Sequence, residues 1–285
     1  MAAPDHTGMF KTKALASRYR LVETLTGIFA PPLINQSGIA SYPGRAVVLD
    51  NACGTGIISS TLNTTLSDQV KKDWELTCAD FSPAMIDQAQ QRAIDEGWQN
   101  AEAKLVDAQD TQLPSGYYTH IFTAFAFPMI PDTEAALREC FRILQPGGTY
   151  ASTNWKTTPQ IKLMISSLEA LSAHLPLPDP ETFQEGLVKG WDDEARPKAA
   201  LEAAGFTDVK VTPVTKHTSM PVAQFVELNQ SFVPAILGQF WTDEQREQHG
   251  GRVPEVMQKW LEEKFGVGGE VPLGPTVIVA TARKP

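Results

Sequence analysis

Strand-like and helix-like segments alternate between residues 46 and 155, and this alternation constrains the fold more than any other feature of the chain. The expected strands occupy residues 46–50, 74–80, 103–108, 119–125 and 147–155, and the expected helices occupy 56–67, 82–97 and 132–144. Strands that alternate with helices at this spacing form a parallel sheet covered by helices on both faces. We therefore predict an α/β protein that binds its ligand at the carboxyl ends of the strands.

The rhythm changes after residue 155, where two helical segments interrupt the series. Residues 156–193 and 216–270 carry helical patterns, and we expect them to pack over the carboxyl ends of the strands as a lid. Residues 194–215 are predicted to add a helix and a strand to the core, and residues 271–285 the last core strand. Residues 1–45 are expected to be an N-terminal helical lid, and residues 46–155 the ligand-binding core of a single domain.

Composition limits the partners and the compartment. Of the 285 residues, 24 are basic and 33 acidic, for a net charge of -9, so nucleic acid and anionic membranes are poor partners. The three cysteines, Cys53, Cys78 and Cys140, share no metal-ligand spacing, and we expect buried, reduced thiols and no metal. Because no secretory signal or membrane span is visible, we expect a soluble, cytoplasmic protein, and a monomer.

The first strand leads into a turn that contains two glycines, in "VVLDNACGTGIISSTL" (47–62). Gly54 and Gly56 let the backbone approach a ligand closely, and the helix that begins near Gly56 presents unpaired N–H groups. Such a turn suits either a dinucleotide pyrophosphate or the methionine carboxylate of S-adenosylmethionine. The dinucleotide pattern is imperfect, since Ser59 stands at its third position. Asp50 favours S-adenosylmethionine, because an acid would repel a pyrophosphate but attract an ammonium group.

Acidic residues end the next two strands as well. Asp80 is placed to accept hydrogen bonds from both ribose hydroxyls, although nicotinamide-dependent enzymes share this feature. Asp107 and Ala108 end the third strand, where an acid can accept from an adenine amino group, and Phe81 and Met85 would flank the ring. Each acid alone is often a solvated turn residue. Three acids in this order predict a site for S-adenosylmethionine.

Five motifs carry a resemblance to a known family: "VVLDNACGTG", "CADFSPAMIDQA", "LVDAQDTQLP", "THIFTAFAF" and "FRILQPGGTYASTNW". In sequence and spacing they resemble the successive motifs of class I S-adenosylmethionine-dependent methyltransferases. The resemblance implies a Rossmann-like fold with a mostly parallel seven-stranded sheet, helices on both faces and helical lid insertions. It also assigns a cofactor-binding position to Ala52, where many members carry glycine.

A narrower resemblance covers nearly the whole chain, including "MFKTKALASRYR", "LTGIFAPPLINQSGIA", "FWTDEQREQHGGRVPEV" and "EVPLGPTVIVATARKP". These segments look like the fungal thiol methyltransferases of the gliotoxin bis-thiomethyltransferase type. The resemblance implies S-methylation of a small dithiol, a reduced epidithiodiketopiperazine, with S-adenosylhomocysteine as the second product. Two alternatives stay open: an O- or N-methyltransferase of another secondary metabolite, and a protein that binds the cofactor without transferring methyl. A nicotinamide-dependent oxidoreductase is more distant.

Apolar side chains are the remaining candidates for ligand contact. Tyr19 in an N-terminal lid helix and Phe125 at the end of the fourth strand are expected to contact the cofactor. The acceptor is expected to contact Met9 and Phe10 in that helix, and Phe127, Met129, Asn154 and Trp155 at the ends of the fourth and fifth strands. The competing interpretation is that these aromatic side chains belong to the core.

No histidine is placed to act as a base. His120 opens the fourth strand, at the end remote from the expected site. A thiol acceptor needs no strong base, since an unperturbed thiol titrates at about 8.5. Alignment of the reactants in a dry, apolar pocket would then supply much of the catalysis.

Overall fold

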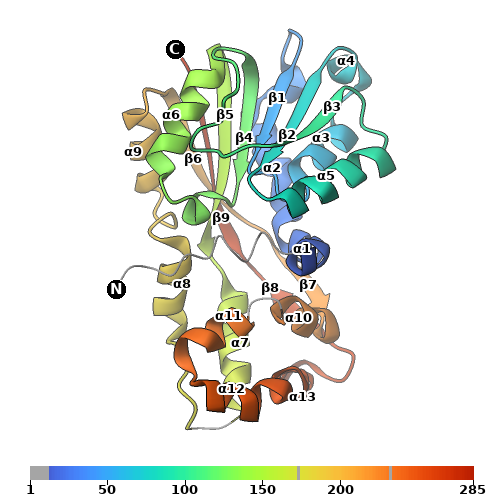
Figure 1. The fold of residues 1–285 in the computed structure, drawn as a ribbon, viewed down its shortest axis with the longest axis vertical. Helices are drawn as coiled ribbons and strands as arrows, with labels where there is room; N and C mark the ends of the chain where they lie inside the picture. Colours follow the sequence, from blue (N-terminus) through green and yellow to red (C-terminus); the bar gives the residue numbers. More distant parts are fainter. Residues whose placement is uncertain (1–12, 172–173, 231–232) are drawn as a thin grey trace. The chain divides into compact units, whose positions relative to one another are not determined.

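The computed structural model describes residues 13–171, 174–230 and 233–285 of the chain (Figure 1). The described residues form two compact units. The first contains the residues up to 156, 190–214 and 277–285, and the second contains residues 157–189 and 215–276. Each unit is described by itself below.

The first unit is built on a seven-stranded sheet, counted over the described residues, with the strand order β3-β2-β1-β4-β5-β9-β6. Its strands are β1 (Val47–Asn51), β2 (Glu75–Asp80), β3 (Ala101–Leu105), β4 (Tyr118–Ala124), β5 (Leu144–Thr157), β6 (Thr207–Thr215) and β9 (Thr276–Arg283). The pairs β2–β3, β1–β2, β1–β4 and β4–β5 are parallel. The chain order reverses between β1 and β4, and ligands of open α/β sheets bind at such a point.

Strands β6 and β9 run antiparallel at the other side of the sheet. The Thr207 hydroxyl donates to the Arg283 carbonyl near one end of the pair, at 3.4 Å, and the hydroxyls of Thr215 and Thr276 lie 2.9 Å apart at the other end. The sheet is therefore mostly parallel, and the predicted α/β class is confirmed.

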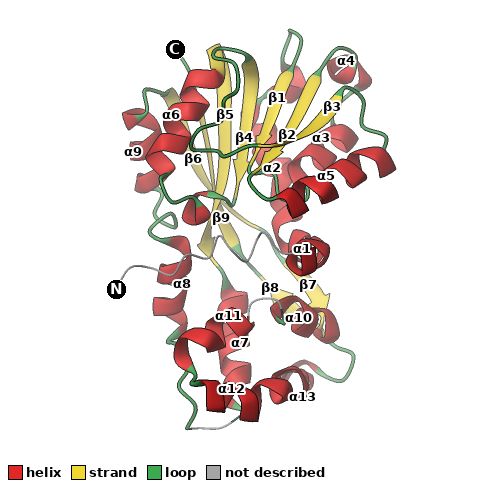
Figure 2. Ribbon diagram, viewed as in Figure 1, coloured by secondary structure: helices red, strands yellow, loops and turns green. Residues whose placement is uncertain are grey.

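Helices cover both faces of this sheet (Figure 2). The helical segments of the first unit are α1 (Lys13–Thr26), η2 (Gly27–Phe29), α2 (Ala30–Ser37), η3 (Ile39–Ser41), α3 (Ile57–Thr65), α4 (Asp68–Lys71), α5 (Pro83–Asp95), η4 (Phe127–Met129), α6 (Thr133–Ile143) and α9 (Ala195–Ala203). Alternate strand residues point to opposite faces, so Val48 packs with α2, α3 and α5, whereas Leu49 packs with α6 and α9. Both residues are fully buried, as a parallel sheet covered on two sides requires.

The sequence sets the ends of α5, the helix that follows β2. Ser82 is its N-cap and accepts a hydrogen bond from the Met85 N–H at 3.3 Å, and Pro83 occupies the first helical position. Gly97 follows the helix with a φ of 64°, a conformation that ends helices and favours glycine. These signals place the start of α5 directly after the carboxyl end of β2.

The second unit is mainly helical and contains one pair of short strands. Its elements are α7 (Pro159–Glu169), α8 (Pro180–Val188), β7 (Thr218–Pro221), α10 (Val222–Asn229), α11 (Val233–Phe240), α12 (Asp243–His249), η5 (Gly250–Arg252), α13 (Val253–Phe265) and β8 (Glu270–Leu273). The sequence patterns predicted its helices but not the antiparallel pair β7–β8. None of the helices in the described ranges combines the length and the hydropathy that crossing a bilayer requires.

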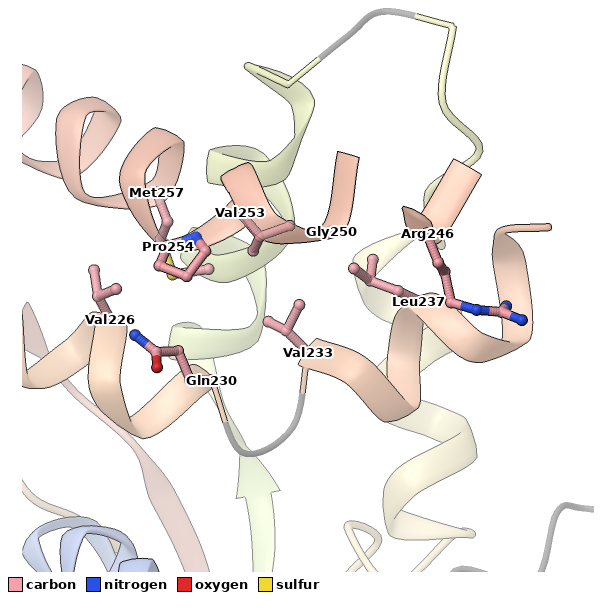
Figure 3. Close-up of a pocket in the computed structure, with 9 residues that line it drawn as sticks. All are labelled: Val226, Gln230, Val233, Leu237, Arg246, Gly250, Val253, Pro254 and Met257. Atoms are coloured by element: carbon pink, nitrogen blue, oxygen red, sulfur yellow. The ribbon is translucent and has the colours of Figure 1, made fainter. Parts of the chain in front are cut away.

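A small cavity lies inside the second unit (Figure 3). It has a volume of about 250 Å³, below the roughly 300–1,000 Å³ of typical ligand pockets, and most of its wall is apolar. Arg246 contributes to the wall, but its guanidinium donates to the carbonyl of Trp241, near the end of α11. The cavity is therefore a gap in the apolar packing of this unit, and the arginine in its wall caps a helix.

Candidate functional site

The turn between β1 and α3 has an unusual backbone. Ala52, Gly54 and Gly56 have φ angles of 55°, 56° and 84°, in the left-handed region. A Cβ on Gly54 would lie 3.3 Å from the Tyr19 ring, and one on Gly56 would lie 3.1 Å from the Trp98 ring. Both positions therefore favour glycine, for its conformation and for the space it leaves. Ala52 adopts the same conformation with a Cβ, at a cost of about 1 kcal/mol that is typical of strained sites.

Asp80 connects the end of β2 to the glycine turn. Its side chain is buried, and Oδ2 accepts from the Gly54 N–H at 2.9 Å while Oδ1 accepts from the Ser82 N–H at 2.9 Å. Burial raises the pKa of this carboxyl, although backbone hydrogen bonds oppose the shift. Each carboxylate oxygen can accept a further hydrogen bond. The contact between Asp80 and the ribose hydroxyls stays a prediction, and the Asp80 carboxylate is a suitable hydrogen-bond acceptor for it.

Asp50, at the end of β1, contacts α3. Its Oδ2 accepts from the Ser59 N–H at 3.1 Å and from the Ser59 hydroxyl at 2.7 Å. The residue is only 1% exposed, and burial raises its pKa to about 7, with a smaller contribution from the nearby charge of Asp80. Two buried carboxyls with raised pKa values favour a cationic ligand over a pyrophosphate, because a cation stabilises their ionised forms.

The residues expected around an adenine ring lie at the ends of β2 and β3. Met85 and Ala108 are buried, and Phe81 is half-buried. Asp107 is exposed, and its Oδ1 accepts from the backbone N–H of Gln109 at 2.9 Å. The third strand ends at Leu105, so Asp107 lies in the following loop and not at the last strand position that the sequence predicted.

Tyr19 reaches the glycine turn from helix α1. Its ring lies against the turn at Gly54 and packs on Ala84 and Met85 at the start of α5. Burial, followed by the charges of Asp80 and Glu23, raises the pKa of its hydroxyl, which keeps Tyr19 neutral. Residues 13–26 form helix α1, on which Tyr19 adjoins the expected cofactor site, and the role of this helix as a lid stays a prediction.

An aromatic cluster lies where β4 and β5 end. The rings of Phe125 and Trp155 are 4.5 Å apart, and Phe29 packs edge-on against both, with centroid distances of 6.3 and 5.9 Å. Phe125 has a φ of 59°, which is rare for a bulky residue, and its N–H donates to the Thr153 carbonyl at 2.8 Å. Phe29 was not among the predicted residues, because the sequence gives no sign that η2 approaches these strand ends.

The other residues predicted to contact the methyl acceptor lie in different surroundings. Phe127 is 2% exposed and stacks on Trp191 at 4.5 Å, so its ring packs in the core, and its contact with an acceptor stays a prediction. Asn154 is fully buried, and its amide has no hydrogen-bond partner among the described residues. Met129 is half-buried at the end of η4. Met9 and Phe10 lie outside the described residues.

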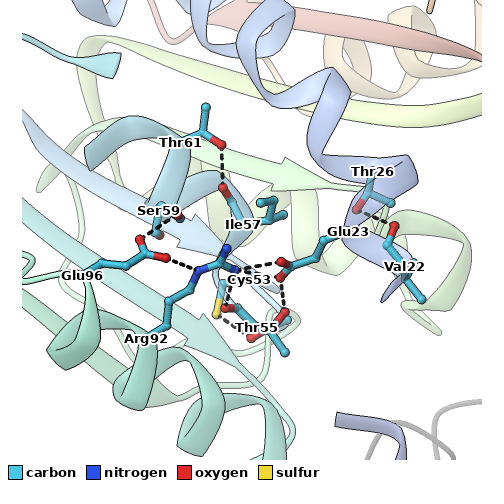
Figure 4. A network of polar contacts seen from close by, with 12 residues as sticks. Val22, Glu23, Thr26, Cys53, Thr55, Ile57, Ser59, Thr61, Arg92 and Glu96 are labelled. Carbon is cyan, nitrogen blue, oxygen red and sulfur yellow. Dashed lines mark hydrogen bonds and ion pairs between the residues drawn. The ribbon is translucent and has the colours of Figure 1, made fainter. Parts of the chain in front are cut away.

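Sequence reasoning missed a buried polar network beside the glycine turn (Figure 4). Arg92 on α5 forms ion pairs with Glu23 on α1 and with Glu96, one turn along α5. Thr55, inside the turn, donates its hydroxyl to Glu23. The available signal was the spacing of residues 85, 89, 92 and 96, which places Arg92 and Glu96 on the same helix face as two buried residues.

A buried histidine and a second hollow lie elsewhere in the first unit. His120, near the amino end of β4, is buried, which lowers its pKa to about 4, and its Nδ1 lies 2.9 Å from the Thr119 hydroxyl. A hollow of about 800 Å³ is lined by residues at the amino ends of β2 and β3, including Trp74 and Asn100. Within the described ranges, no three His, Cys, Asp or Glu side chains are grouped to hold a metal ion, and the three cysteines are buried and free.

Comparisons with known proteins show the family of the chain. Residues 48–148 match the family model described as a methyltransferase domain. The chain is 46% identical over 286 residues to the acetylaranotin bis-thiomethyltransferase of Aspergillus terreus, covering all of both chains. It is 45% identical to methyltransferase tpcH of Aspergillus fumigatus, over 97% of this chain and 99% of the relative.

Solved structures share the fold. The phosphoethanolamine N-methyltransferase 2 of Haemonchus contortus, in complex with S-adenosyl-L-methionine, is 15% identical with a TM-score of 0.58, over 99% of this chain and 59% of that chain. The cyclase SpnF is 17% identical with a TM-score of 0.53, over 91% of this chain and 80% of that chain. The sheet order and the glycine turn thus define a class I methyltransferase fold. The chain belongs to the S-adenosylmethionine-dependent methyltransferase family.

Proposed function

We propose that this methyltransferase transfers methyl groups to the sulfur atoms of a small, apolar dithiol, and that a reduced epidithiodiketopiperazine is the substrate class. The observation that carries the proposal is the aromatic cluster of Phe29, Phe125 and Trp155 at the ends of β4 and β5. Phe125 and Trp155 are half-buried and can offer apolar ring surface to a ligand, whereas Phe29 is fully buried and supports both rings from the core. The name of the relative from Aspergillus terreus, a bis-thiomethyltransferase, adds support for sulfur as the acceptor atom.

The cofactor residues have separate tasks in this proposal. Asp80 holds the ribose hydroxyls, Asp50 supplies negative charge towards the ammonium group, and Tyr19 covers the glycine turn. Phe81, Met85 and Ala108 surround the adenine, with Asp107 at its amino group. When bound, S-adenosylmethionine supplies a methyl group on a positively charged sulfur, and the charge is lost as the methyl passes to the acceptor.

Methyl transfer to a thiol needs no strong base and is favoured by an apolar surface. A thiol is a few per cent ionised near neutral pH, so solvent can remove its proton before reaction. Attack by a thiolate on a sulfonium cancels charge, and aromatic walls that exclude water favour such a step. Trp155 and Phe125 would then orient the acceptor, and His120 would take no part, since it lies near the amino end of β4.

A panel of acceptors tests the sulfur assignment. We expect labelled methyl from S-adenosylmethionine to appear on the sulfur atoms of reduced dithiols at rates at least about 100-fold above those of matched phenols and amines. The rate should rise by up to about ten-fold per pH unit below the acceptor's own pKa. Mass spectrometry of the products provides the measurement. Methylation of oxygen or nitrogen alone would contradict the proposal, and so would no methylated acceptor in the panel.

A further inference from the structure

The search for further function leads to the buried network between α1, α5 and the glycine turn. Arg92 and Glu23 have side chains that are only 11% and 8% exposed. The Arg92 Nη1 lies 2.8 and 3.0 Å from the two carboxylate oxygens of Glu23, so one nitrogen is shared between both oxygens. Such a buried ion pair affects stability, because loss of one partner would leave an uncompensated charge inside the protein.

The network holds the glycine turn directly. Arg92 Nη1 also donates to the Thr55 carbonyl at 3.2 Å, and the Thr55 hydroxyl donates to Glu23. Thr55 lies between Gly54 and Gly56, which both have left-handed backbone. The carbonyl and the hydroxyl of Thr55 are thus both bound by one ion pair.

Glu96 extends the network beneath the turn. Its carboxylate accepts from Arg92 Nε at 2.8 Å, from the Ser60 hydroxyl of α3 at 2.7 Å and from the Trp98 indole at 2.9 Å. The Trp98 ring is the group that a Cβ on Gly56 would meet. Directly or through Glu96, Arg92 on α5 therefore connects helix α1, the glycine turn and helix α3.

Glu23 forms the buried ion pair that joins helix α1 to α5, so it is a charged anchor of α1. Tyr19 precedes Glu23 by four residues, which puts both on one face of α1. While Glu23 is held by Arg92, the Tyr19 ring lies on Gly54 and Met85. The anchor and the ring that covers the glycine turn thus lie on the same face of α1.

We propose that Glu23 and Arg92 are positioning residues for the cofactor: their buried ion pair fixes α1 and the glycine turn in the binding-competent arrangement. This inference rests on the placement of the cofactor given under Proposed function, and it does not depend on the identity of the acceptor. Neither side chain needs to touch the cofactor. When the pair is broken, α1 is released for part of the time, and the apparent affinity falls in proportion to the competent fraction.

Three variants test the proposal: Glu23→Gln, Arg92→Met and the double variant. Calorimetric titration with S-adenosylhomocysteine, at a temperature where circular dichroism shows each variant folded, should give a dissociation constant raised about ten-fold or more in each. Hydrogen exchange of α1 should rise in parallel, while kcat at saturating cofactor changes little. Arg138→Met is the matched control, because Arg138 pairs with Glu134 on the exposed face of α6 and should leave both readouts unchanged.

The double variant separates positioning from stability. Removing both charges relieves the buried unpaired group, so its thermal stability should exceed that of Arg92→Met, whereas its cofactor affinity should stay low. If the double variant recovers cofactor affinity together with stability, the proposal is overturned. A folded Glu23→Gln variant that binds the cofactor as tightly as the wild type would overturn it too. If Arg92→Met does not fold, Glu23→Gln decides alone. A wild-type protein that does not bind S-adenosylhomocysteine would instead overturn the cofactor placement.

Discussion

Replacing Asp80 by alanine is expected to weaken the binding of S-adenosylhomocysteine by about 100-fold, because two charge-assisted hydrogen bonds of about 1.5 kcal/mol each would be lost. The same change removes the acceptor for the N–H groups of Gly54 and Ser82, which loosens the glycine turn. The fold should persist, since the change removes one small side chain and leaves the apolar core on both faces of the sheet intact. Calorimetry measures the affinity and circular dichroism the fold.

Asp95→Ala provides the control for Asp80→Ala. Asp95 is an exposed acid at the end of α5 and accepts from the Gln91 amide at 2.8 Å. Its removal subtracts the same charge from the chain without touching the strand ends, so the affinity should stay within about two-fold. An Asp80→Ala protein that binds as tightly as the wild type would mean that the ribose lies elsewhere.

Asp50→Asn is expected to change stability and affinity in opposite directions. The pKa of Asp50 is raised in the folded protein to about 7 from 3.8, so its stabilising contribution is complete below pH 3.8 and is lost as the pH rises through 7. At pH 8 the ionised carboxylate is buried at a cost of up to about 4 kcal/mol, which asparagine avoids while it still accepts from Ser59. The cofactor-free variant should therefore melt at a higher temperature than the wild type at pH 8.

The affinity of the Asp50→Asn variant should fall for the same electrostatic reason. A cationic ligand stabilises the ionised form of Asp50, so the wild type should bind S-adenosylmethionine about ten-fold more tightly at pH 8 than at pH 6, with proton release at the lower pH. The variant should lose this pH dependence and bind about ten-fold more weakly at pH 8. Titrations in two buffers of different ionisation enthalpy measure both effects. A pH-independent wild-type affinity would show that Asp50 does not sense the ligand.

The core of the fold could be predicted because its strands are buried on both faces. The run ending at Asp50 is apolar throughout, and the structure confirms a central strand there. The third strand was placed too late, at 103–108, because it lies at the edge of the sheet, where alternate residues are exposed and the apolar pattern is weak. The short strands β7 and β8 each contain a proline and only four residues, which is too short a stretch for apolar alternation to identify a strand.

The candidate site was predictable in position but not in the direction of its side chains. Strand ends locate Asp50 and Asp80, yet only the structure shows that Asp50 contacts α3 while Asp80 contacts the glycine turn. The direction of the Phe127 ring could not be predicted, because β4 ends at Ala124 and the chain turns, so strand alternation no longer applies there. Glu23 and Arg92 lie 69 residues apart, and no local pattern reports a contact at that separation.

A crystal structure of the complex with S-adenosylhomocysteine tests the placement of the cofactor most directly. We predict that both ribose hydroxyls lie within about 3.2 Å of the Asp80 carboxylate, with the methionine portion against the glycine turn under Tyr19. A ribose bound elsewhere, with Asp80 still bonded only to Gly54 and Ser82, would contradict the account.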